Sequence, residues 1–305
     1  MADLSLDLCG VRLKNPVIAA SGTFGFGREF DELYDISALG GISVKGLSLK
    51  PRTGNPPSRI AETPSGMLNS VGLQNPGVES FIEHDLPWLL KKDIAVIANI
   101  TGTCVEEYVR MAEVLAPTGV HMLEMNISCP NVHEGGVAFG VKPESVYAIT
   151  KAVKAAARQP LIVKLTPNVA DITENALAAQ EAGADAISMI NTLTGIAVDV
   201  QKRRMILANN TGGLSGPAVR PVALRMVWQS AKKVSIPIIG MGGIETGEDA
   251  AAFMLCGARA VMVGTANFTD PFACPRVIRE LNDYCDAQGV GNAQELVGTL
   301  KEYGG

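Results

Sequence analysis

Short runs of consecutive apolar residues recur along the whole chain, separated by longer stretches in which apolar and polar residues alternate with helical spacing. The runs lack the strict polar–apolar alternation of a half-exposed strand, so they predict strands buried on both faces, as in a parallel sheet. The predicted strands are Pro16–Ala20, Gly41–Lys45, Ile94–Asn99, Val120–Asn126, Leu161–Leu165, Ala186–Ile190, Ile236–Gly240 and Ala260–Gly264.

The segments between these runs predict helices. Asp171 with Glu174, and Thr246 with Asp249, have the spacing of capping boxes at helix starts. The predicted helices are Glu29–Ala38, Val78–Lys91, Val105–Ala116, Pro143–Arg158, Ile172–Ala182, Pro217–Val234 and Gly247–Cys256.

Buried strands that alternate with helices predict an α/β fold, a (β/α)8 TIM barrel. The alternative is a doubly wound open sheet, which usually carries G-x-G-x-x-G after its first strand. Here Gly22–Gly27 follows the first run and does not match that pattern, so the barrel is favoured. The Pro- and Gly-rich segment Leu47–Pro76 predicts a long insertion after the second strand, over one end of the barrel. Without a shift in composition, residues 1–305 are expected to form a single domain.

The composition excludes several classes of protein. With 47% apolar and 19% charged residues the chain is not intrinsically disordered. Its net charge is −5 and it has no basic stripe, which argues against a nucleic-acid binder. The absence of a signal segment or a long apolar run predicts a cytoplasmic protein without a membrane partner. The six cysteines are scattered without C-x-x-C spacing, so no metal site is expected.

Polar residues and glycines follow every predicted strand, where the loops of such a barrel carry the chemistry. Lys45 and Lys164 end apolar strands, and because a buried ammonium needs an acceptor, they predict an electron-rich ligand. The glycine clusters at 242–243 and 264 predict a phosphate-binding corner built from backbone N–H groups.

The segment Asn126–Asn131 places two amides and the thiol of Cys129 just beyond the fourth strand. An amide both donates and accepts, which suits an imide or a carboxylate. The thiol could serve as a nucleophile or as a base.

Six blocks resemble dihydroorotate dehydrogenases, and they occur in that family's order along the chain. They are Ala20–Gly25, Asn69–Asn75, Asn126–Asn131, Lys164–Asn168, Ile190–Thr192 and Gly212–Pro217. The resemblance implies an FMN-containing barrel that oxidises (S)-dihydroorotate to orotate in pyrimidine biosynthesis. It also implies that Cys129 is the general base, that a hydride passes to flavin N5, and that Lys164 stabilises the reduced flavin.

The site residues are carried over from the same resemblance. The implied FMN contacts are Ser21, Lys45, Gly46, Asn99, Asn126, Lys164, Ile190, Gly216, Gly242, Gly243, Gly264 and Thr265. The implied dihydroorotate contacts are Lys45, Asn69, Ser70, Val71, Gly72, Leu73, Asn126, Asn191 and Thr192.

The loops at Gly22–Gly27 and Gly135–Gly140 are similar to those of the class 1B catalytic subunit. Class 2 enzymes use a serine base and carry an N-terminal extension, and neither feature is seen here. Class 1B implies electron transfer to NAD+ through a partner subunit with FAD and [2Fe–2S], and a homodimer within a heterotetramer. Three alternatives stay open: a fumarate-linked class 1A enzyme, a Schiff-base aldolase using Lys45 or Lys164, and a non-catalytic binding subunit.

Overall fold

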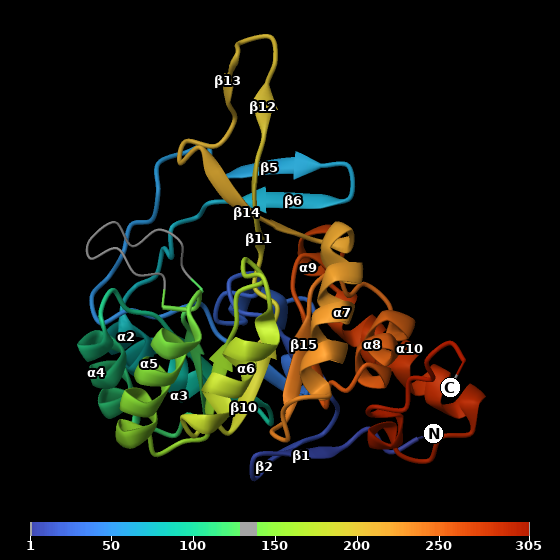
Figure 1. Cartoon of the computed structure of the whole chain (residues 1–305). Helices are drawn as coiled ribbons and strands as arrows, with labels where there is room; N and C mark the ends of the chain where they lie inside the picture. The colour runs from blue at the N-terminus through green and yellow to red at the C-terminus, as the bar shows by residue number, and fades with distance from the viewer. Residues whose placement is uncertain (1, 129–138, 305) are drawn as a thin grey trace.

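A computed structural model describes residues 2–128 and 139–304, and its centre is a closed barrel of eight parallel strands (Figure 1). The prediction of a (β/α)8 barrel is confirmed, and the doubly wound sheet is wrong. All eight predicted strands are present, with ends that differ by no more than two residues, and their residues are buried as expected. In barrel order they are β3 (Val17–Ala19), β4 (Gly41–Ser43), β7 (Ala95–Ile100), β8 (Met122–Asn126), β9 (Leu161–Lys164), β10 (Ala186–Met189), β15 (Ile238–Met241) and β16 (Ala260–Val263).

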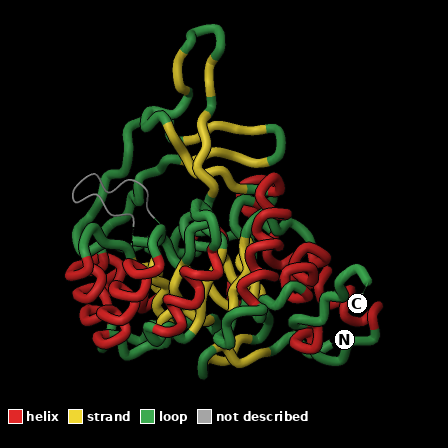
Figure 2. The backbone as a smooth tube through the Cα atoms, viewed as in Figure 1, coloured by secondary structure: helices red, strands yellow, loops and turns green. Residues whose placement is uncertain are grey.

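Helices surround the barrel strands (Figure 2). Those that match predicted ones are α4 (Val105–Leu115), α5 (Pro143–Ala156), α6 (Ile172–Glu181), α7 (Arg220–Ala231, preceded by a 3-10 turn at Pro217–Val219) and α8 (Gly247–Leu255). The stretch 78–89 is also helical, as α2 (Val78–Ser80), a π-helical turn (Phe81–Asp85) and α3 (Leu86–Leu89). Helices α9 (Ala266–Thr269) and α10 (Ala273–Gln288) and the 3-10 turn at Ala293–Leu296 were not predicted.

The structure corrects two helix predictions. The helix expected at Glu29–Ala38 is broken into α1 (Arg28–Asp31) and a 3-10 turn (Ile36–Ala38), because extended Asp35 caps the N–H of Ser37 and begins a new turn. Thr246 and Asp249 do form a capping box, whereas Asp171 caps the N–H of Thr173 without a reciprocal bond from Glu174. None of the helices in the described ranges is long and apolar enough to cross a membrane.

An N-terminal hairpin closes the bottom of the barrel. Strands β1 (Leu6–Leu8) and β2 (Val11–Leu13) pair antiparallel, and their leucines pack against buried side chains of the barrel interior, including Ile97 and Met262. The amino ends of the barrel strands are therefore sealed by apolar contacts, which leaves the carboxyl ends as the open mouth.

A second, four-stranded sheet lies above this mouth (Figure 1). Its antiparallel strands follow the order β11 (Leu193–Ile196), β14 (Thr211–Ser215), β6 (Gly66–Asn69) and β5 (Ile60–Thr63). The predicted insertion at Leu47–Pro76 is thus confirmed, but it supplies only half of the sheet. The other half comes from the segment after β10, whose tip is the projecting hairpin of β12 (Val198–Asp199) and β13 (Arg204–Met205).

Candidate active site

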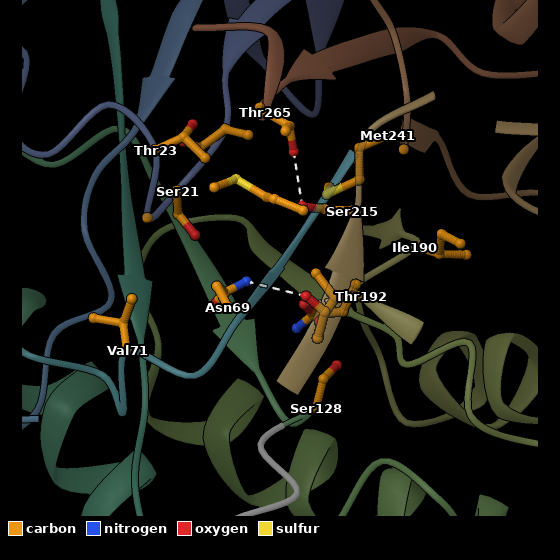
Figure 3. Close-up of a pocket in the computed structure, with 18 of the residues that line it drawn as sticks. Ser21, Thr23, Asn69, Val71, Ser128, Ile190, Thr192, Ser215, Met241 and Thr265 are labelled. Carbon is orange, nitrogen blue, oxygen red and sulfur yellow. Dashed lines mark hydrogen bonds between the residues drawn. The ribbon is translucent and has the colours of Figure 1, made fainter. Parts of the chain in front are cut away.

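A cavity of about 280 Å³ lies between the mouth of the barrel and the four-stranded sheet. Residues at the carboxyl end of each of the eight barrel strands line it, and so does the segment 69–73 of the insertion. Figure 3 shows part of this lining, including Asn69, whose Nδ2 donates to the Gly213 carbonyl oxygen at 3.4 Å. Segments far apart in the sequence therefore meet at one site.

Every predicted site residue that the structure describes lines this cavity. These residues are Ser21, Lys45, Gly46, Asn69, Ser70, Val71, Gly72, Leu73, Asn99, Asn126, Lys164, Ile190, Asn191, Thr192, Gly216, Gly242, Gly243, Gly264 and Thr265. Cys129 lies outside the described residues. Co-location does not assign a role, so the binding and catalytic roles of all these residues stay predictions.

Two asparagines are oriented by hydrogen bonds to each other and to the backbone. Asn191 Nδ2 donates to Asn126 Oδ1 at 3.2 Å, and that oxygen also accepts from the N–H of Ser128 at 3.3 Å. The oxygen of Asn191 accepts from the N–H of Thr192. Because its oxygen is occupied on the protein side, Asn126 has its NH2 group left as a donor for a ligand.

Two lysines supply the positive charge of the cavity, in different surroundings. The Nζ of Lys164 lies 3.9 Å from the Glu124 carboxylate, and both side chains are almost fully buried. Within the described part of the chain Lys45 has neither an ion pair nor a hydrogen bond from its Nζ, and burial lowers the pKa of this lysine below its ordinary value. Lys45 can therefore offer its whole charge to an anionic ligand, whereas Lys164 shares its charge with Glu124.

The predicted phosphate corner has open backbone donors. Gly242 and Gly243 have positive φ angles of 126° and 77°, in the region that favours glycine. In the described residues neither N–H has a hydrogen-bond acceptor. A Cβ on Gly243 would come within 2.7 Å of the Gly216 carbonyl oxygen, so only glycine fits this backbone path. Nearby, Thr265 Oγ1 donates to Ser215 Oγ at 2.8 Å (Figure 3).

The family model for dihydroorotate dehydrogenase matches residues 3–285 of the chain. The chain belongs to the dihydroorotate dehydrogenase family. A relative from Alkaliphilus oremlandii is 56% identical over 98% of this chain and 99% of its own. Relatives from Geobacillus kaustophilus and Geobacter sulfurreducens are each 54% identical over 98% of this chain and over 96% and 98% of their own. All three are named dihydroorotate dehydrogenase B (NAD(+)), catalytic subunit.

Two residues in or next to this cavity were not among the predicted site residues. Asn168 donates to Thr166 Oγ1 and to the Thr192 carbonyl, and accepts from the N–H of Thr194, so it joins the end of β9 to the start of β11. It stands in the block Lys164–Asn168 that carries the family resemblance, which was the available signal. Glu124 was also missed, although it is the one charged residue of strand β8, whose other residues are apolar or, in Asn126, an amide.

Proposed function

We propose that this chain is the catalytic subunit of an NAD+-linked dihydroorotate dehydrogenase, a single FMN-binding barrel domain that oxidises (S)-dihydroorotate to orotate. The observation that carries the proposal is the mouth cavity, where two lysines, oriented asparagine side chains and free backbone donors converge. The names of relatives that match nearly the whole chain support the same activity.

The cavity residues fit FMN. Asn99 Oδ1 and Ser70 Oγ belong to residues of the lining, are buried, and have no hydrogen-bond partner among the described residues. A bound ligand could supply the missing partners. The N–H groups of Gly242 and Gly243 suit a phosphate. The residues that would hold FMN are the twelve cofactor contacts carried over from the family resemblance, the first of which is Ser21 and the last Thr265. FMN, when bound, supplies the acceptor for the two electrons that leave the substrate.

The chain's own residues bind and orient the substrate and move its proton. Lys45 offers its ammonium to the carboxylate of dihydroorotate, while the amides of Asn69, Asn126 and Asn191 hold the ring. The segment 70–73 and Thr192 complete the substrate contacts. Cys129 takes the proton from the ring carbon as the hydride leaves the neighbouring carbon. Lys164, held by Glu124, supplies positive charge where reduction adds negative charge.

The names of the relatives support NAD+ as the final electron acceptor. The words "catalytic subunit" in the relatives' names imply a second subunit. We propose that it carries FAD and [2Fe–2S] and passes electrons to NAD+, in a cytoplasmic heterotetramer built on a homodimer. A fumarate-linked enzyme is the second candidate. The purified chain should reduce NAD+ only after the partner is added, whereas efficient use of fumarate by the isolated chain would favour the second candidate.

Substrate-dependent bleaching of a bound flavin tests the function directly. The purified chain should be yellow, and dihydroorotate without an acceptor should bleach the visible absorption because the substrate's electrons stay on the protein. Orotate, the product, should leave the colour unchanged and serves as the control. A yellow protein that dihydroorotate does not bleach would contradict the activity, and trapping of a substrate imine by borohydride would favour an aldolase instead.

Lys45→Met is expected to weaken orotate binding by about 10- to 100-fold, the value of one hydrogen bond to a charged group. In the wild type, affinity should also fall as pH rises through the lowered pKa of Lys45, because the neutral amine no longer attracts a carboxylate. The variant should lose this pH dependence, and its apoprotein should melt at a higher temperature because a buried charge is gone.

Calorimetric titration with orotate across the alkaline range, together with thermal unfolding, measures both effects. Lys91→Met, on an exposed lysine, is the control. Unchanged orotate affinity in Lys45→Met would remove Lys45 from the substrate site.

A further inference from the structure

The carboxylate of Glu124 is enclosed in the barrel interior beneath the cavity. Its side chain projects from β8, has no exposed surface and does not line the cavity. The reaction proposed above gives it no direct contact with substrate or cofactor. A buried carboxylate is nevertheless costly, so its contacts should explain why it is there.

Side chains from four other barrel strands surround this carboxylate. Ser43 Oγ and Asn99 Nδ2 donate to Oε2 at 2.7 and 2.6 Å. Ser188 Oγ donates to Oε1 at 2.7 Å. The ammonium of Lys164 lies 3.9 Å from Oε1. One oxygen therefore holds the Asn99 amide, and the other faces the cation.

This arrangement decides which way the amide of Asn99 points. An ionised carboxylate only accepts hydrogen bonds, so the group that faces Glu124 must be the NH2. The carbonyl oxygen of Asn99 is thereby directed away, toward Gly46, where an added Cβ would lie 3.0 Å from it. That oxygen is buried, belongs to a residue of the cavity lining, and has no partner in the described chain.

We infer that Glu124 is a positioning residue that fixes Asn99 as a hydrogen-bond acceptor in the floor of the cofactor cavity. The ligand selected is one that offers an N–H to Asn99 and an electron-rich group to Lys164. This inference rests on the proposed function, in which the ligand is FMN. Without the carboxylate, the amide of Asn99 is free to rotate by half a turn. It would then present its NH2 group to the ligand in place of its carbonyl oxygen.

Glu124→Gln tests this because glutamine keeps the shape but has only one accepting atom. The ammonium of Lys164 attracts that oxygen, which turns the glutamine NH2 toward Asn99 and reverses its amide. We expect the apoprotein to bind FMN about 10- to 100-fold more weakly, as measured by quenching of flavin fluorescence. Ser188→Ala is the matched control, because it removes a donor from the same carboxylate and leaves the bond to Asn99. Its FMN affinity should stay within about threefold of wild type.

The double variant Asn99→Asp with Glu124→Gln exchanges the two partners. The glutamine NH2 then donates to the new carboxylate, whose second oxygen faces the cavity as an acceptor, and the number of buried charges is unchanged. FMN affinity should return to within about threefold of wild type. Because the swap keeps one carboxylate in the barrel interior, it tests the inference even if the single variant does not fold, as thermal unfolding will show.

Three results would overturn the inference: wild-type affinity in Glu124→Gln, an equal loss in Ser188→Ala, or a folded swap variant whose FMN affinity stays about 10-fold or more below that of wild type. Failure of the wild-type chain to bind FMN would instead overturn the proposed cofactor. The two failures are therefore distinguishable.

Discussion

Cys129→Ala is expected to lower the turnover of dihydroorotate by about 10²- to 10⁴-fold, the usual contribution of a positioned general base. FMN should stay bound, because the family contacts to the cofactor do not include the thiol. The reason for the loss is that hydride departure needs the neighbouring proton to be removed. A thiol with an ordinary pKa of about 8.5 is mostly protonated at neutral pH, so wild-type turnover should rise above pH 7.

Stopped-flow bleaching of the bound flavin by dihydroorotate measures this step without the partner subunit. Cys256→Ala is the control, because Cys256 is buried at the end of α8 and its burial raises the pKa of the thiol. Such a thiol stays protonated and unreactive. Near wild-type bleaching in Cys129→Ala would exclude the thiol as the base.

Lys164→Met is expected to destabilise the protein by about 3–5 kcal/mol, because it leaves the buried Glu124 carboxylate without its cation. Ser43, Ser188 and Asn99 would still donate to the carboxylate, but none of them carries charge. The variant should also bind FMN about 100-fold more weakly or lose it during purification, since a charge-assisted contact is removed.

Stability and cofactor binding are separated by a second substitution. Lys164→Met combined with Glu124→Gln removes both buried charges, and most of the lost stability should return in denaturant unfolding. FMN affinity should not return with it, because the cation is still missing. If Lys164→Met unfolds at the wild-type denaturant concentration, the pair contributes nothing to stability. If it also binds FMN normally, Lys164 has no role toward the cofactor.

The barrel was predictable because its strands are buried on both faces. A strand such as β9 is apolar up to the lysine at its carboxyl end, and such a short apolar run between helical segments is visible directly in the sequence. The charged amphipathic helix α10 was not predicted, although its buried positions Val277, Leu281 and Cys285 repeat every four residues. The four-stranded mouth sheet could not be predicted in full, because β6 pairs with β14, about 145 positions away in the sequence, and no local pattern marks such a partner.

Sequence alone located the carboxyl ends of the barrel strands to within two residues, and with them most of the residues of the candidate site. Parallel barrel strands all finish at the same end, so Lys45, Asn126 and Lys164 had to meet wherever the barrel closed. Only the tertiary structure decided which atoms these residues present. In the sequence, Glu124 only interrupts the apolar pattern of its strand. The structure gives it a role, because its carboxylate contacts Asn99 and Lys164 from neighbouring strands. The direction of a hydrogen bond depends on partners from other strands, and those partners adjoin only after the barrel has formed.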